Sequence, residues 1–255
     1  MSMIERPEGG FDFVPGSGTY CNDAVARPGF AIAHAVFVRA LPLARAFEAA
    51  RAYLEGLGRP MAALCGAEVR IAEPLSFDGF GAFNATYIAL LDAFGLRVTV
   101  DGARQGAATR TNVAPAPHAA RPVEPSLYGF SFTVPGQRPG GRKTFVSAGA
   151  GELPGGTRES IIRRGETTPD AMREKARWVM GSVVGRLPRL GVGVQDITHT
   201  NVYCVHSADG YWESEVLPPL GAQAAHGARW FHARPPILEV EFEVDLKGVL
   251  HEVWL

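Results

Sequence analysis

The chain repeats one pattern of residues in its two halves. Residues 47–80 carry an amphipathic run that ends in Leu-Gly, then a β-rich run, then a Ser-x-Asp-Gly-aromatic motif, and residues 180–211 carry the same features in the same order. Leu57 and Leu190, which close the two amphipathic runs, lie 133 residues apart, and the β-rich runs keep that offset. Self-similarity at half the chain length predicts duplication of one α+β unit, with pockets between the two copies.

Hydrophobic spacing predicts the elements of the first half. Apolar residues separated by three and four positions predict helices over 43–57 and 80–94, because that period places them on one helical face. Short apolar or alternating runs predict strands at 35–38, 65–71, 109–113 and 130–134. The order of the first half is therefore β-α-β-α-β-β.

The second half is predicted to follow the same order. A strand at 143–149 is followed by an inserted loop, 150–167. Thr168, Pro169 and Asp170 then supply an N-cap, a proline at the first helical position and an acid in the first turn, which predict the start of a helix. The closing strand is predicted at 237–245, where apolar and acidic residues alternate strictly.

Residues 136–141, a polar run rich in turn-forming residues, predict a linker. The sequence thus predicts two domains, 1–135 and 142–255, each a mixed open sheet with helices on one face. The length of 255 residues, of which 46% are hydrophobic, suits two units of ordinary domain size.

Composition excludes several classes of partner. The formal net charge is −1 and no long Lys/Arg run occurs, which argues against a nucleic-acid partner. The N-terminal residues contain no apolar signal core, and no stretch is long enough to span a bilayer. Three widely spaced cysteines in a chain of this length favour reduced thiols, so we expect a cytoplasmic protein with no membrane partner.

Several segments resemble the Rid superfamily (YjgF/YER057c/UK114), whose members have a chorismate-mutase-like α+β fold. Phe145–Gly149, Gly191–Val205 and Leu238–Glu241 carry the likeness in the second half, and Ala82–Tyr87 and Thr109–Thr111 carry it in the first. The likeness covers nearly the whole chain as a tandem pair. The combination of Thr-Arg-Thr-Asn-Val with Ala-Arg-Pro-Pro is similar to the 2-amino-5-chloromuconate deaminase family.

The resemblance implies an enzyme that hydrolyses imines or enamines without a metal or an organic cofactor. In such enzymes an arginine binds the substrate carboxylate while backbone groups and a carboxylate position water. A bidentate guanidinium fixes a planar carboxylate in one orientation, which suits this chemistry. The implied partners are a small carboxylate substrate and other copies of the chain, since the family typically forms trimers.

Arg110 matches the family's arginine, and Asn112 lies two residues further on the same strand face. The alternative for Arg110 is a surface or inter-domain salt bridge. Asn84 matches a position at which the family has an asparagine. In the second half either Arg229 or Arg234 matches the arginine position, and the sequence leaves this choice open.

The inserted loop matches a family segment whose backbone contacts the ligand, which implies that Ser147 and the backbone of Gly149–Gly151 shape the pocket. Glu152 is a candidate general acid or base, with a solvated loop carboxylate as the alternative. Arg163 and its neighbour Arg164 would suit the second carboxylate of a dicarboxylic substrate, with a solvated basic turn as the alternative.

Three acidic residues alternate along the predicted closing strand: Glu239, Glu241 and Glu243. On one strand face they would repel one another and raise at least one pKa. The resemblance places the family's functional glutamate at Glu239, whereas Glu243 is expected to belong to a solvent-facing polar stripe. His199 and His206 would face opposite ways on a strand, so we expect no metal site.

Together these observations predict a deaminase that releases ammonia from an enamine or imine carboxylate, of the 2-aminomuconate type formed during aromatic degradation. Two alternatives stay open. A chorismatase-like hydrolase would share the fold, and a duplicated unit with a degenerate site could serve as a non-catalytic ligand-binding or assembly module.

Overall fold

Strands and helices of the N-terminal half alternate as the sequence predicts, with additional strands before and between them. The structure is a computed structural model that describes residues 3–255. The strands of this half are β1 (Ile4–Arg6), β2 (Phe11–Pro15), β3 (Cys21–Ala26), β4 (Phe30–Pro42), β5 (Leu64–Arg70), β6 (Arg97–Val100), β7 (Ala103–Gly106), β8 (Thr109–Pro115) and β9 (Ser126–Pro135). Its α-helices are α1 (Leu43–Gly56) and α2 (Phe77–Ala93).

The C-terminal half has fewer helices. Its α-helix is α3 (Pro169–Gly185), and its strands are β10 (Phe145–Gly151), β11 (His199–Cys204), β12 (Arg229–Phe231), β13 (Ala233–Arg234), β14 (Phe242–Gly248) and β15 (Glu252–Trp254). The start of α3 is confirmed: Pro169 occupies the first turn, and the Thr168 side chain accepts a hydrogen bond from the Ala171 N–H at 3.3 Å. This bond satisfies one of the free donors of the helix end.

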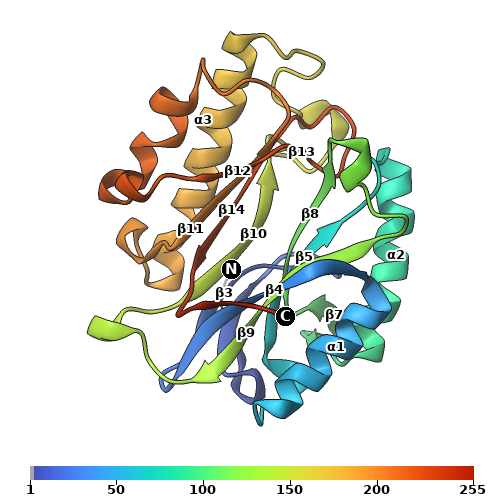
Figure 1. Cartoon of the computed structure of the whole chain (residues 1–255), viewed down its shortest axis with the longest axis vertical. Helices are drawn as coiled ribbons and strands as arrows, with labels where there is room; N and C mark the ends of the chain where they lie inside the picture. The colour runs from blue at the N-terminus through green and yellow to red at the C-terminus, as the bar shows by residue number, and fades with distance from the viewer. Residues whose placement is uncertain (1–2) are drawn as a thin grey trace.

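A mixed sheet of 13 strands curls through the molecule, with α3 beside one part of it and α1 and α2 beside the other (Figure 1). The main path of the sheet is β12-β11-β14-β10-β3-β8-β5-β9-β4-β15. Within it, β8-β5-β9-β4 and β12-β11-β14-β10 share one arrangement: the first pair is parallel and the next two pairs are antiparallel. The two halves thus have the same strand order.

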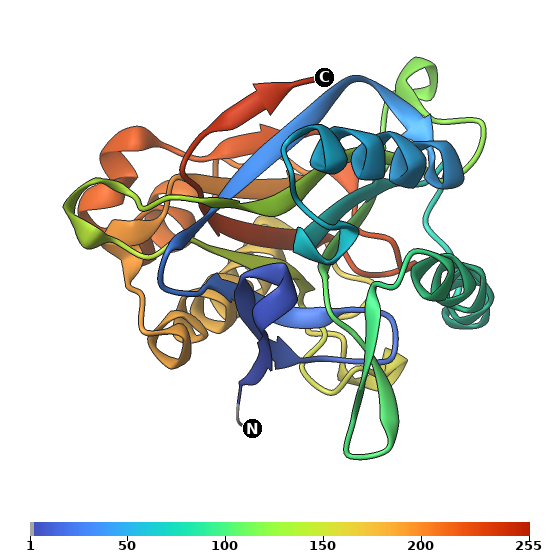
Figure 2. The ribbon, with the colours of Figure 1, turned by 90° about the horizontal axis from the view of Figure 1, so that it is seen from below.

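The expectation of two separate open sheets is wrong. Strand β3, in a segment where no strand was predicted, lies between the halves and pairs with β10 on one side and β8 on the other. At the far end of the chain β15 runs parallel to β4, so the last residues of the second half extend the sheet of the first (Figure 2). Backbone hydrogen bonds therefore join the halves into one sheet.

The expected second helix of the C-terminal half is also absent from its predicted place. Short non-α segments at Trp212–Val216 and Pro218–His226 occupy it. Pro218 and Pro219 lack the N–H groups that a continuous helix needs, and Gly221 has a φ of 57° inside the second segment. The sequence pattern was repeated, but the helix was not.

The closing strand starts later than predicted. Strand β14 begins at Phe242 rather than at residue 237, and Glu239 has a φ of 72° in the turn before it. The N–H groups of Glu241 and Phe242 donate to the Glu152 carboxylate, at 2.7 and 3.1 Å, instead of to a neighbouring strand. The prediction that Glu239, Glu241 and Glu243 share one strand face is therefore wrong.

The two faces of the sheet differ in chemistry. Val202, Val244 and Leu246 pack in the cluster that contains α3, while the alternate residues of β14 point to the opposite face. There Asp245 accepts a hydrogen bond from Thr111 of β8 at 2.8 Å, and the Lys247 ammonium lies 2.6 Å from the Glu68 carboxylate of β5. A buried polar seam, defined by these four side chains, therefore connects the inner faces of the two halves.

The β6–β7 hairpin projects away from the main sheet (Figure 2). Within residues 3–255 no helix has the length and hydropathy needed to cross a bilayer.

Candidate active site

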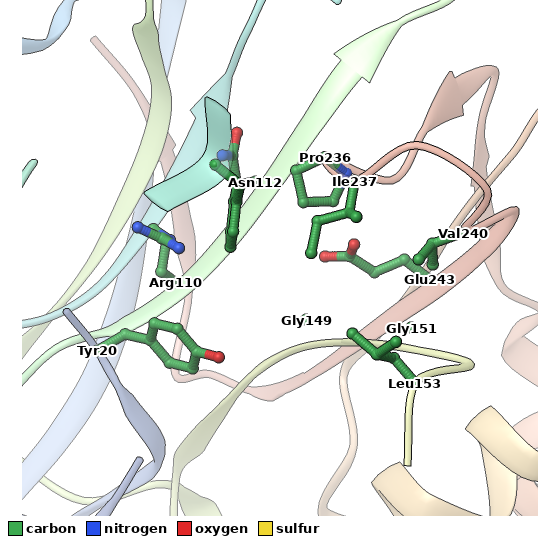
Figure 3. A pocket seen from close by; sticks show the side chains of 11 residues that line it. Tyr20, Arg110, Asn112, Gly149, Gly151, Leu153, Pro236, Ile237, Val240 and Glu243 are labelled. Atoms are coloured by element: carbon green, nitrogen blue, oxygen red, sulfur yellow. The ribbon is translucent and has the colours of Figure 1, made fainter. Parts of the chain in front are cut away.

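A cavity of about 110 Å³ lies where the two halves meet. The N-terminal half contributes Tyr20, Phe80, Arg110 and Asn112, and the C-terminal half contributes the end of β10 and the segment that leads into β14. In Figure 3, Arg110 and Asn112 stand on one side of the gap and Glu243 extends toward them from the other. Neither half forms this cavity alone.

Arg110 is buried with most of its hydrogen-bonding capacity unused. Strand β8 directs its guanidinium against α2, where Nη1 donates to Asn84 Oδ1 at 2.8 Å. Four aromatic rings surround the guanidinium carbon at 5.0–5.4 Å, those of Tyr20, Phe80, Phe83 and Tyr87. Burial lowers the pKa of Arg110, and nearby Tyr87, Tyr20 and Glu243 oppose that shift. Within residues 3–255 no carboxylate lies close enough to form an ion pair with it.

Asn112 also faces the cavity from β8, and it is 3% exposed. Neither its amide nitrogen nor its amide oxygen has a hydrogen-bond partner among the described residues. An unpaired buried amide costs free energy, so a bound group that pairs with it is stabilised. The amide can donate to and accept from one ligand.

Glu243 supplies the carboxyl group of the cavity. Burial, together with the negative charge of Asp245, raises its pKa to about 8, against the opposing effect of Arg110. The group is therefore mostly protonated at neutral pH, and it forms no ion pair with the residues that the structure describes. A neutral carboxyl at this position can donate a proton.

Gly149 allows the Glu243 side chain to enter the cavity. A β-carbon at residue 149 would lie 2.0 Å from Glu243 Oε1 and 3.2 Å from the Thr111 methyl group. Gly151, two residues later, would place a β-carbon 2.7 Å from Val240. Gly149 thus keeps space beside the carboxyl open, and Gly151 keeps space beside Val240 of the cavity lining.

The arrangement combines an unpaired cation, an unpaired amide and a neutral acid around a small cavity. A guanidinium of this kind binds a planar carboxylate, and the acid lies across the cavity from it. This geometry is suited to proton transfer on a small organic carboxylate.

Comparison with known proteins gives the family. A family model described as 2-aminomuconate deaminase CnbZ matches residues 3–253. The chain belongs to this family. It is also 34% identical over 250 residues to a 2-amino-5-chloromuconate deaminase from Comamonas testosteroni, and the match covers 97% of this chain and 96% of the relative.

Of the residues predicted from the sequence of this CnbZ family member, the structure brings five to the cavity or its immediate support. Arg110, Asn112, Gly149 and Gly151 line the cavity, and Asn84 holds the Arg110 guanidinium. Ser147 is buried on β10 beside Asp23 of β3, and its hydroxyl has no hydrogen-bond partner among the described residues. It does not line the cavity.

Glu152 lies in the interior of the C-terminal half rather than at the cavity. Its carboxylate is 2.9 Å from the Lys175 ammonium, and it also accepts the N–H groups of Glu241 and Phe242. Burial raises its pKa, against the opposing effects of Lys175 and the backbone donors. In this position Glu152 fixes the turn before β14 and so sets where β14, which carries Glu243, begins.

The other predicted groups form ion pairs outside the cavity lining. Glu239 pairs with Arg158 at 2.5 Å, and Arg164 lies 3.8 Å from it. Arg163 pairs with three acidic residues on the surface, Glu166, Asp170 and Glu174. Arg234 is exposed and pairs with Glu241 at 3.1 Å, while Arg229 pairs with Glu252. Neither arginine of the second half takes a position like that of Arg110.

Two polar side chains of the cavity lining were not identified from the sequence. Tyr20 precedes β3, a strand that the hydrophobic pattern did not reveal. Glu243 was interpreted as solvent-facing because it continues an alternating acidic pattern, whereas it is 5% exposed. Within residues 3–255 no group of three or more His, Cys, Asp or Glu side chains could hold a metal ion.

Proposed function

We propose that the chain is an enzyme that hydrolyses a 2-aminomuconate-type dicarboxylate and releases ammonia during aromatic degradation. One observation supports this most directly: a buried arginine, with no acidic partner among residues 3–255, faces a protonated glutamic acid across a small cavity. The family membership and the name of the Comamonas relative point to the same reaction.

In this proposal Arg110 binds one carboxylate of the substrate. The carboxylate replaces the partner that the guanidinium lacks, and Asn84 holds the other edge of the guanidinium at 2.8 Å. Asn112 pairs with polar atoms of the bound molecule. The aromatic rings around Arg110 exclude water, which strengthens the ion pair between guanidinium and carboxylate.

Glu243 then moves protons. As the neutral acid it protonates the enamine carbon, which gives the iminium ion and a carboxylate on Glu243. That carboxylate accepts a proton from water as the water oxygen bonds to the iminium carbon, which gives a carbinolamine. Glu243 next donates this proton to the nitrogen, and the C–N bond breaks with its electron pair leaving on ammonia. The hydroxyl proton returns to Glu243 as the C=O bond forms, so the neutral acid is regenerated. The balance is one enamine and one water giving one 2-oxo acid and one ammonia.

The same strand order in the two halves supports a further part of the proposal, that each half is a Rid-type unit derived from one duplicated gene. The proposed site then lies at an interface between two such units. The two candidate arginines of the second half, Arg229 and Arg234, pair with Glu252 and Glu241, which is consistent with one active site per chain.

The activity is tested by measuring ammonia release from 2-aminomuconate with the purified chain. Arg110→Met should lower kcat/KM by about 10²–10³-fold, because one bidentate charged pair is lost. Arg45→Met, at an exposed position of α1, is the matched control and should leave turnover unchanged. Equal turnover by the Arg110 variant would remove the proposed role of this residue, and absence of ammonia release by the unaltered chain would refute the proposed reaction.

A further inference from the structure

A second and larger cavity, of about 470 Å³, lies in the N-terminal half and shares no residue with the candidate active site. The end of β4 and the start of β9 form one wall, through Ala40, Pro42, Ser126 and Tyr128. The loop between β8 and β9 forms another wall, and Arg70 of β5 also lines it. A volume of this size is within the range of small-molecule sites.

This cavity occupies the place in the first half that the candidate active site occupies in the second. Strand β10 has a register shift, after which Gly151 pairs with Glu243 of β14. Strand β4 has a register shift at the corresponding point, after which Pro42 pairs with Ser126 of β9. The segment that leads into the closing strand lines the cavity in both cases. Ser126 therefore stands where the active-site cavity has Glu243.

Arg70 is a buried cation whose hydrogen-bonding capacity is largely unused. Its side chain is 8% exposed. Nη1 donates only to the neighbouring Val69 carbonyl at 3.1 Å, and Nη2 has no hydrogen-bond partner among the described residues. The nearest carboxylate oxygen, of Glu68, is 3.6 Å from Nη2, and Glu68 already lies 2.6 Å from the Lys247 ammonium. The negative charge of Glu68 is thus shared between Lys247 and Arg70. Arg70 keeps N–H donors that no described residue accepts from.

The walls around Arg70 are flat and mostly apolar. The Tyr128 ring lies 4.3 Å from the guanidinium carbon, and Pro42 and the proline-rich loop of residues 115–124 supply apolar surface. Glu124 is the acidic residue of the lining, so a second negative charge on a ligand would be repelled. These features select a planar molecule with one carboxylate and an apolar remainder.

We infer that this second cavity binds a planar monocarboxylate through Arg70 and does not turn it over. The guanidinium pairs with the carboxylate, and the apolar part lies along Tyr128 and the prolines. Catalysis is absent because Ser126 cannot supply the proton transfer of an acidic residue. Binding at this cavity is inferred from the geometry at Arg70 and does not depend on the proposed deamination, whereas the absence of turnover rests on the role proposed for Glu243.

The test is a calorimetric titration of sorbate, a planar unsaturated monocarboxylate, into the chain carrying Arg110→Met. That background removes the cation of the other cavity. We expect one equivalent of sorbate per chain, and sorbyl alcohol, which lacks the charge, should bind roughly tenfold more weakly or worse. Absence of sorbate binding, or equal binding of the alcohol, would overturn the inference.

Filling the cavity gives the second arm of the test. Ala40 is exposed at its rim, so Ala40→Trp adds bulk without disturbing the core, and it should abolish sorbate binding. The control variant Ala52→Trp, at an exposed position of α1, should leave sorbate binding unchanged. Sorbate binding that survives Ala40→Trp would place the ligand elsewhere. In the chain with Arg110 intact, Ala40→Trp should leave ammonia release unchanged, which separates this inference from the proposed function.

Discussion

At the scale of single residues, the candidate active site holds two ionisable groups whose surroundings oppose their charged forms. Burial lowers the pKa of Arg110 and raises that of Glu243 to about 8. The guanidinium remains charged at neutral pH because the ordinary pKa of an arginine lies far above 7, whereas the carboxyl becomes neutral. A buried cation that has no acidic partner among the described residues lowers the stability of the ligand-free protein. An anionic ligand that pairs with the cation stabilises it.

The Glu243 carboxyl gives a prediction for the pH dependence of turnover. Because the protonated form is the proton donor, kcat/KM should fall as the pH rises through about 8. Glu243→Gln keeps the shape and removes the proton transfer, so kcat should drop by about 10²–10⁴-fold. Ammonia release measured from pH 6 to pH 10 checks both. An unchanged profile in the variant would assign the proton transfer to another group.

The same group has a predicted effect on stability. Its ordinary pKa is 4.5, so between pH 4.5 and about 8 an unfolded chain releases this proton while the folded chain keeps it. The free energy of unfolding should therefore decrease with rising pH across that window. Urea unfolding at several pH values should show a shallower decrease for Glu243→Gln than for the unaltered chain. Parallel curves would show that Glu243 is not protonated in the folded state.

At the scale of elements, the register shift in β10 and the late start of β14 bring the two sides of the cavity together. The shift lies between Ser147 and Ala150, and the Glu152 carboxylate that follows holds the N–H groups of Glu241 and Phe242. Glu243 is thereby the second residue of β14 and points away from α3. Bulges of this kind re-aim side chains next to active sites.

This close packing predicts that Gly149→Ala impairs the site. The added methyl group would lie 2.0 Å from Glu243 Oε1, so the carboxyl must move by about an ångström or more. A misplacement of that size can lower kcat/KM by about 10²-fold. Gly181→Ala in α3, where nothing lies within 4 Å of the added atom, is the control. It should keep full activity and raise stability by roughly 0.5–1 kcal/mol. Equal activity of both variants would contradict the packing argument.

At the scale of the whole molecule, charges buried between the halves connect them. Lys247 lies 2.6 Å from the Glu68 carboxylate of the first half and 2.8 Å from the Asp245 carboxylate of its own strand. Asp245 also accepts hydrogen bonds from Thr111 and Tyr203, both at 2.8 Å. This polar seam lies on the same face of β14 as Glu243, so it fixes the relative positions of the two cavity walls.

Removing the cation of the seam should destabilise the whole molecule. Lys247→Met leaves Glu68 and Asp245 without their ammonium partner, and breaking a buried pair in this way costs about 3–5 kcal/mol. Combining it with Glu68→Gln should restore part of that loss, because the second change removes the unpaired charge. Urea unfolding measures both, with Lys143→Met at an exposed position as the control. A loss no larger than that of the control would show that the seam contributes little.

The sequence by itself determined the elements that depend on local periodicity. The helices over 43–56 and 169–185 and the strand after each were predictable, because one apolar face or one N-cap is encoded by residues close together in the chain. The family resemblance singled out Arg110 and Asn112, and their motif likewise lies on a single strand. These features need no knowledge of what packs against them.

Only the tertiary structure decided how the halves join and which carboxyl faces Arg110. Strand β3 is short, and its role depends on partners more than 80 residues away, Thr109 and Ser147, which no local pattern shows. The alternation of Glu239, Glu241 and Glu243 predicted one continuous strand. Instead, the N–H groups of Glu241 and Phe242 donate to the buried Glu152 carboxylate, and the strand begins only at Phe242. Glu243 was thereby turned into a buried cavity, where desolvation rather than sequence spacing sets its protonation.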